Sequence, residues 1–186
     1  PQLPLLESGE PVESLLPRLA AANAYLGADI ISEALRRNAQ IVVTGRVADP
    51  SLFLGCMLHG LGWAYDDYTR LAAGTFAGHL MECAAQLTGG CFADLPRKPV
   101  PDMARIGFPF ADIGVDGDIQ FGKVPGSGGR LDVATCTEQA LYEMHDPARY
   151  ITPDCVLDIT QAEFRQVAEN RVAMSGAQGR ARTSSY

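Results

Sequence analysis

The stretch from Leu71 to Ala93 constrains the fold of this chain most, because Glu82 is its only formally charged side chain. The stretch also contains one histidine and four glycines. It is therefore too polar and too interrupted for a membrane-spanning helix, which needs about 20 consecutive apolar residues. Its pattern instead predicts one long helix or two joined helices from Asp66 to Leu87. We expect Gly89 to end this segment, because glycine readily adopts the left-handed conformation that follows a helix.

Length and composition are typical of a globular protein. The chain has 186 residues, of which 47% are hydrophobic and 20% are charged, and a chain of this length buries a sizeable core. We therefore treat residues 1–186 as one domain or as part of one. The 15 basic and 22 acidic residues give a net charge of −7. This charge disfavours nucleic acid and an anionic membrane surface as partners.

Cysteine usage points to a reducing compartment. The five cysteines are widely spaced, their number is odd, and no CxxC motif is present. Such a pattern is unlike the disulfide framework of a small secreted protein and favours free thiols. No basic segment followed by an apolar one opens the chain, so no signal peptide is expected. We therefore expect a cytoplasmic protein.

The first half of the chain has the pattern of a parallel α/β unit. Ala28–Asn38 predicts a helix, because its apolar residues share one face and basic residues lie near its end. The β-branched run Gln40–Thr44 predicts a buried strand of a parallel sheet. Pro50 is typical of the first turn of a helix, and we expect this second helix to reach about Leu58.

The second half adds an antiparallel hairpin and a further helix. The turn signal Asp116-Gly117 predicts a hairpin over Phe108–Val124. A helix from Thr135 to about His145 is expected, because Glu138 stands at capping-box spacing from Thr135. Further strands are expected at Val156–Ile159 and Arg171–Met174. The predicted fold class is α/β, with a mostly parallel core sheet, flanking helices and an antiparallel hairpin.

The first candidate site is a polar stripe on the helix predicted after Asp66. On a helical wheel His79, Glu82 and Cys83 fall within one arc, and apolar residues fill most of the remainder. A solvated helix face normally carries several charges, so the stripe predicts a cleft. His79 and Glu82 are three residues apart and are predicted to act as general base and orienting acid. The alternative is a buried polar network in which Cys83 is simply packed.

The second candidate site lies at the end of the predicted parallel strand, where α/β proteins bind ligands. Arg46 can grip a carboxylate or a phosphate in bidentate fashion. Asp49 can pair with Arg46 or cap the next helix, so a purely structural pair is the alternative. Asn23 and Tyr25 precede the first helix and are further candidate substrate contacts. Their alternative roles are a helix cap and a packed aromatic ring.

The third candidate site is the glycine loop between the hairpin and the later helix. Gly126, Gly128 and Gly129 can expose backbone amides that cradle an anion. Glu138 and Gln139 in the following helix complete this set of candidate substrate contacts. The alternative is a plain connection between the hairpin and the helix.

No metal site and no cofactor are expected. The chain has three histidines, and His59 and His145 have no partner at ligand spacing. The glycine loop matches neither the P-loop nor the dinucleotide-binding fingerprint. The residues taken by themselves therefore predict an α/β domain with a polar cleft.

Several strings, read in order, carry a resemblance to one family. The chain resembles the acyclic terpene utilisation (AtuA-like) family from about residue 22 to residue 179. The matching strings are long and collinear, which makes a chance match improbable. They are Ala22–Ala28, Val43–Asp49, Ala73–Leu80 with Glu82-Cys83, Thr88–Gly90, Gly107–Pro109, Thr137–Gln139, Tyr142-Glu143 and Tyr150–Asp154.

The resemblance implies a role in the catabolism of branched terpenoids such as citronellol and geraniol, which proceeds through CoA thioesters. It implies an enzyme of lyase, hydratase or hydrolase type that acts on a branched acid or its acyl-CoA thioester. A non-catalytic subunit of the same pathway and a ligand-binding sensor are the alternatives. The resemblance brings no established catalytic residues, so the candidate sites above rest on the residues themselves.

The resemblance also concerns the extent of the chain. Domains of this family are typically longer, so the chain is expected to correspond to the middle portion of such a domain. Its expected partners are a small-molecule substrate, a CoA thioester among the candidates, and either a second copy of the chain or a preceding segment.

Overall fold

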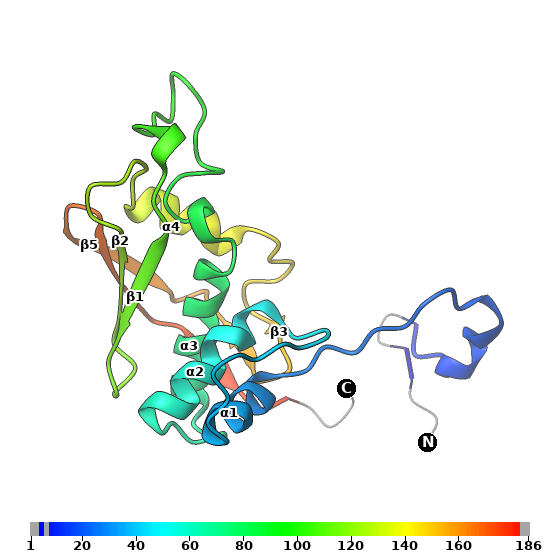
Figure 1. Cartoon of the computed structure of the whole chain (residues 1–186). Helices are drawn as coiled ribbons and strands as arrows, with labels where there is room; N and C mark the ends of the chain where they lie inside the picture. Colours follow the sequence, from blue (N-terminus) through cyan, green and yellow to red (C-terminus); the bar gives the residue numbers. More distant parts are fainter. Residues whose placement is uncertain (1–3, 6–7, 183–186) are drawn as a thin grey trace.

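The computed structural model describes residues 4–5 and 8–182 (Figure 1). The helices are α1 (Ala28–Arg36), α2 (Asp49–Leu61), α3 (Tyr68–Met81) and α4 (Val133–Leu141), with short 3-10 turns η1 (Val12–Ser14), η2 (Leu16–Arg18), η3 (Ala84–Gln86) and η4 (Met103–Arg105). The strands are β1 (Pro109–Ile113), β2 (Ile119–Lys123), β3 (Tyr150–Ile151), β4 (Val156–Asp158), β5 (Glu163–Ala168), β6 (Arg171–Ser175) and β7 (Gln178–Arg180).

The protein is a mixed α/β structure with two antiparallel sheets. One sheet has the order β1-β2-β6-β5 and the other β3-β4-β7. All strand pairs of these sheets are antiparallel, so the prediction of a mostly parallel core sheet is wrong. The physical reason is connectivity. The pairs β1–β2 and β5–β6 are joined by tight turns, whereas parallel strands need long crossover connections.

The β-branched run that predicted a parallel strand is not a strand. Gln40–Thr44 has no regular secondary structure, and Ile41 and Val43 are 84% and 90% exposed. Parallel pairing near this run is reduced to a single bridge between Leu26 and Val47. The prediction is wrong because a strand forms only beside a neighbouring strand, and the described chain supplies none here.

Helix α3 forms the centre of the molecule, which explains why it carries no charged side chain after Arg70. Its residues from Gly74 to Leu80 are all buried, and it contacts α2 on one side and β7 and β4 on others. A helix that is covered on nearly every side carries apolar residues all round. The predicted helical segment after Asp66 is confirmed as two pieces, α3 and the turn η3, and Gly89 then adopts a φ of 107°.

Local patterns also account for the other helices and the hairpin. The helices α1 and α2 occupy the predicted ranges, and Pro50 lies in the first turn of α2. The hairpin β1–β2 is confirmed, with Gly117 in its turn at a φ of 92°. Strands β4 and β6 fall in the two ranges expected for further strands. No helix of the described residues is both long enough and apolar enough to cross a membrane.

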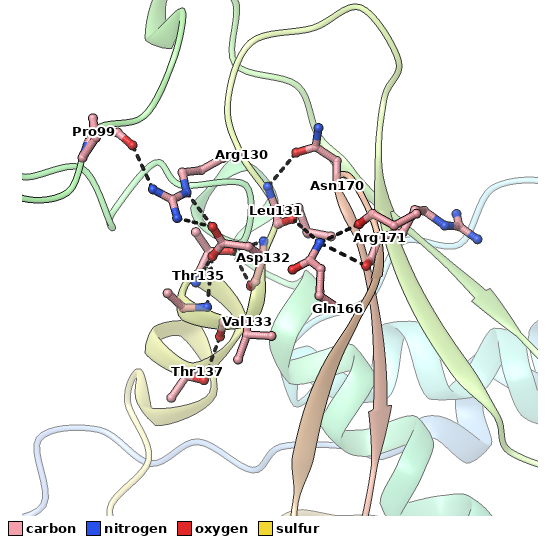
Figure 2. A network of polar contacts seen from close by, with 12 residues as sticks. Pro99, Arg130, Leu131, Asp132, Val133, Thr135, Thr137, Gln166, Asn170 and Arg171 are labelled. Carbon is pink, nitrogen blue, oxygen red and sulfur yellow. Dashed lines mark hydrogen bonds and ion pairs between the residues drawn. The ribbon is translucent and has the colours of Figure 1, made fainter.

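Helix α4 begins earlier than expected and uses a different cap (Figure 2). Asp132 accepts hydrogen bonds from the backbone amides of Ala134 and Thr135, and the Thr135 hydroxyl accepts one from the Asp132 amide. The predicted capping box of Thr135 with Glu138 is therefore wrong. Arg130 holds the Asp132 carboxylate, and the Leu131 amide donates to Asn170 Oδ1 in the β5–β6 turn. These contacts tie the start of α4 to the four-stranded sheet.

Candidate functional site

His79 lies in the last turn of α3 and is only 3% exposed. Its ring stacks on Phe76 and packs against Tyr150 of β3, with ring centroids 6.5 and 5.6 Å away. Helix α3 thus supplies the imidazole, and the strand β3 covers it. The predicted cleft-facing histidine is enclosed between two aromatic rings rather than open to solvent.

The surroundings of His79 favour the neutral imidazole. Burial lowers the pKa of His79 below 6.5. The backbone carbonyls of Ala140 and Gln139 and the charges of Glu143 and Asp49 act in the opposite direction and raise it, but by less. A neutral imidazole has one donor nitrogen and one acceptor nitrogen. His79 Nε2 has no hydrogen-bond partner among the described residues. The ring therefore retains a free nitrogen next to groups that stabilise its protonated form.

Glu82 is not the partner of His79. The Cys83 thiol donates a hydrogen bond of 2.7 Å to Glu82 Oε1, and the carboxylates whose charges act on His79 are Glu143 and Asp49. Helix α3 ends at Met81, and Ala84 has a φ of 48°. Glu82 itself still has helical backbone angles, and its amide donates to the Gly78 carbonyl at 3.0 Å. It therefore stands one turn from His79, but its carboxylate accepts from the Cys83 thiol.

The Glu82–Cys83 pair keeps the thiol protonated. Burial and then the neighbouring Glu82 raise the pKa of Cys83 to about 12, and burial raises the pKa of Glu82. A protonated thiol is a poor nucleophile at neutral pH. The geometry therefore favours a structural contact of Cys83 over nucleophilic attack.

The raised pKa of Cys83 can be tested through the reactivity of its thiol. We expect iodoacetamide at pH 7.5 to label the exposed Cys91 many times faster than Cys83. The substitution Glu82→Gln should accelerate labelling of Cys83, because it removes a negative charge that disfavours the thiolate. Mass spectrometry of tryptic peptides measures both rates, and rapid labelling of Cys83 in the unmodified protein would contradict the assignment.

Three buried polar atoms without partners lie at or beside the contact between α3 and α4. Within the described part of the chain, buried side-chain atoms without a hydrogen bond are His79 Nε2, Gln86 Oε1 and Gln139 Nε2. Buried polar groups are normally satisfied, so such atoms indicate water or a bound group. Gln139 is 3% exposed, whereas the neighbouring Glu138 forms an ion pair with Lys98 at 2.5 Å. Gln139 is thus buried and Glu138 is held in an ion pair, although the sequence grouped both as candidate substrate contacts.

A groove of two adjoining cavities lies beside Tyr150. The smaller, of about 300 Å³, is lined by Tyr25, Asp49, Tyr150 and Thr152, among others. The larger, of about 510 Å³, extends past Arg182. Tyr25 and Pro153 line both cavities, so the two lie on either side of these residues.

Three distant segments of the chain build this groove. The Leu26 amide donates to the Arg46 carbonyl at 3.0 Å, and the Ala48 amide donates to the Leu26 carbonyl at 3.1 Å. Asp154 then accepts hydrogen bonds from the Ala28 amide at 2.7 Å and the Ser51 hydroxyl at 2.5 Å. Backbone hydrogen bonds and the Asp154 carboxylate therefore bring together the segments that contain Tyr25, Asp49 and Tyr150.

The other candidate residues of this region lie at the rim of the groove. The Arg46 guanidinium lies over the Tyr25 ring, 6.0 Å from its centroid, and Asn23 is exposed. No ion pair joins Arg46 to Asp49 in the described residues. Arg46 thus remains available to an anionic ligand. Tyr150 and Asp154 belong to strings noted in the sequence, yet no local spacing marks them as site residues.

The glycine loop serves the packing of its own region. The amides of Ser127, Gly128 and Gly129 donate to the carbonyls of Val124, Arg105 and Pro101. Lys123 donates to the Ser127 carbonyl at 2.7 Å. Gly126 is exposed with a φ of 73°. These three amides of the loop are therefore engaged within the protein and do not point at an anion.

No three histidine, cysteine or acidic side chains within residues 4–5 and 8–182 are arranged to hold a metal ion. A neutral, desolvated imidazole near two carboxylates and beside a cavity is a recognised general-base environment.

Comparison with known proteins identifies the family. The family model of the acyclic terpene utilisation family protein AtuA matches residues 2–186. No curated protein and no solved structure matches the chain. The match covers the α3 helix, the groove and the His79 region alike. The chain therefore belongs to the acyclic terpene utilisation family, AtuA.

Proposed function

We propose that this protein is an enzyme acting on a branched, terpenoid-derived acid or its acyl-CoA thioester. The observation that carries the proposal is the position of His79. Burial favours its neutral form, its Nε2 has no hydrogen-bond partner among the described residues, and its ring packs against Tyr150, which lines the smaller cavity. Family membership supplies the substrate class.

The dimensions and charges of the groove fit such a substrate. Cavities of about 300 and 510 Å³ fall within the range of ordinary small-molecule sites. Tyr25, Tyr150 and Pro153 offer apolar surface to a branched chain. Arg46 and Arg182 offer positive charge to a carboxylate or to the phosphates of a CoA group.

The proposed chemistry is proton transfer by His79. Lyase, hydratase and hydrolase reactions all require a proton to be taken from substrate or water and returned. Neutral His79 accepts the proton, and the resulting imidazolium is stabilised by Asp49, Glu143 and the carbonyls at the end of α4. Because His79 is buried, the Tyr150 ring must turn aside for substrate to reach Nε2.

The second candidate function is a non-catalytic subunit of the same pathway. The burial of His79 between two aromatic rings favours it, because a histidine packed in this way is typical of a residue that supports the fold. Under this reading His79 stabilises the fold and binds no substrate.

The deciding experiment combines melting with turnover. Branched acyl-CoA thioesters, the free acids and free CoA are added to the protein, and melting temperature and product formation by mass spectrometry are recorded. We expect a rise in melting temperature and turnover with a branched thioester or acid. His79→Ala should reduce turnover by at least about 100-fold while the melting temperature changes by only a few degrees.

The matched control is His59→Ala, since His59 lies exposed on α2. It should leave both turnover and melting unchanged. Absence of turnover in the unmodified protein, together with strong destabilisation by His79→Ala, would favour the non-catalytic subunit. Unchanged turnover in the His79→Ala variant would exclude His79 as the base.

A further inference from the structure

We propose that two copies of this chain associate through antiparallel pairing of the segment Gln40–Thr44. The proposal starts from a conflict between sequence and structure. The segment has the composition of a buried strand, yet Ile41, Val42 and Val43 are 84%, 36% and 90% exposed. No backbone hydrogen bond within the described chain uses its amides or carbonyls. Such an exposed, unpaired apolar segment is a template for pairing with another chain.

The sequence of the segment is self-complementary. In an antiparallel pair centred on Val42, Gln40 faces Thr44 and Ile41 faces Val43. Polar ends then meet polar ends, and β-branched residues meet one another, which is a favourable cross-strand combination. A two-fold contact requires this kind of symmetry, because each residue of one copy meets its counterpart in the other.

Charge does not oppose the contact. Between Asn38 and Gly45 the chain carries no charged side chain, so no like charges face each other across the proposed pair. Charged residues are the usual device by which proteins protect exposed strand edges. Their absence here indicates a segment that is covered in the functional protein.

The strand pair needs additional surface, because a stable interface buries about 1,600 Å². The N-terminal arm, residues 8–24, extends away from the rest of the molecule (Figure 1) and contains no buried residue. Its leucines Leu16 and Leu19 are 60% and 49% exposed. Charge contributes little to packing of the arm, because the arm carries Glu10, Glu13 and Arg18, and Arg36 and Arg37 beside the segment are already paired with Glu33.

The exposed leucines of the arm and the exposed Ile41 and Val43 of the segment favour packing of each arm against the other copy, because the contact removes apolar surface from water. A second copy provides both features at once, and the arm then contributes the apolar surface that a short strand pair lacks. This association is independent of the catalytic proposal, because none of the proposed proton-transfer residues takes part.

The test is the mass of the protein in solution, measured by sedimentation equilibrium over a range of concentrations. We expect a reversible dimer, and Val43→Lys should weaken self-association about tenfold or more, because it places a charge in the paired strand. The matched control is Val115→Lys, which makes the same change at a position 57% exposed in the hairpin turn and should leave the association unchanged.

Two further measurements address the register. Alternate amides of Gln40–Thr44, those that donate across the strand pair, should exchange slowly with solvent in the dimer and rapidly in the Val43→Lys variant. In a background with exposed Cys56 and Cys91 changed to serine, Val42→Cys should form an intermolecular disulfide upon addition of diamide, since opposed strand residues lie within disulfide range. A monomer at all concentrations, or a dimer that Val43→Lys does not weaken, would overturn the proposal.

Discussion

Replacing Gly78 by alanine is expected to reduce the free energy of unfolding by about 3 kcal/mol. A β-carbon at Gly78 would lie 2.5 Å from the Pro50 carbonyl oxygen and 2.8 Å from the Pro50 α-carbon. Both contacts are with backbone, so no side chain can rotate to relieve them. Helix α3 would have to move away from the start of α2.

The matched control for this variant is Gly60→Ala. Gly60 lies in α2, and nothing lies within 4 Å of a β-carbon built there. Alanine should therefore stabilise the protein by about 0.5–1 kcal/mol through helix propensity. Chemical denaturation of both variants measures the difference. Equal stability of Gly78→Ala and the unmodified protein would show that α3 does not approach the Pro50 backbone of α2 this closely.

The Gly78 contact also matters for the site. Gly78 precedes His79, and Pro50 follows Asp49. The close approach of these two backbones places the imidazole of α3 near the carboxylate that begins α2. A displacement at Gly78 should therefore alter the environment of His79 as well as the stability of the fold.

Replacing Asp154 by alanine is the second large effect, with an expected loss of about 2–4 kcal/mol. The carboxylate accepts from the Ala28 amide at the start of α1 and from the Ser51 hydroxyl in α2. Ala28 and Ser51 are both fully buried. Their donors would lose their partners, and an unsatisfied buried donor costs about 1–3 kcal/mol. At roughly 2–4 °C per kcal/mol, the melting temperature should fall by several degrees or more.

Two variants separate this effect from simple loss of volume. Asp154→Asn keeps one acceptor oxygen and should cost less than Asp154→Ala. Ser51→Ala combined with Asp154→Ala should cost less than the sum of the two single changes, because they remove the same hydrogen bond. Additive effects would contradict the assigned contact between the two side chains.

The pH dependence of stability gives an independent check. Burial raises the pKa of Asp154 above 3.8, although the hydrogen bonds from Ser51 and Ala28 lower it. The folded state then holds this proton more tightly than the unfolded chain. The contribution of Asp154 to stability is thus fully present below pH 3.8 and declines as the pH rises through its folded-state pKa. Asp154→Asn should remove that decline.

Local sequence patterns predicted the elements that depend on neighbouring residues along the chain. The helices α1, α2 and α3 and the hairpin β1–β2 follow from apolar spacing, Pro50 and the Asp116-Gly117 turn. These signals act within a few residues, so they hold whatever the rest of the chain does. The family was likewise recognisable from strings of sequence and is confirmed.

Contacts between distant segments decided the rest. The segment Gln40–Thr44 has strand composition but no neighbouring strand, so it stays exposed. Glu82 stands at helical spacing from His79, yet its carboxylate accepts from the Cys83 thiol, a choice of partner that the spacing does not reveal. The sheets are antiparallel because their strands meet through short turns, a property that no single strand sequence encodes.

The sequence by itself therefore determined the family, the helices, the hairpin and the histidine on α3. The tertiary structure decided which groups surround that histidine. Tyr150 and Glu143 come from segments more than 60 residues along the chain from it, and neither has a local pattern that links it to His79. Packing and desolvation arise from such distant contacts. Only the folded arrangement buries the His79 imidazole against Tyr150 and lowers its pKa.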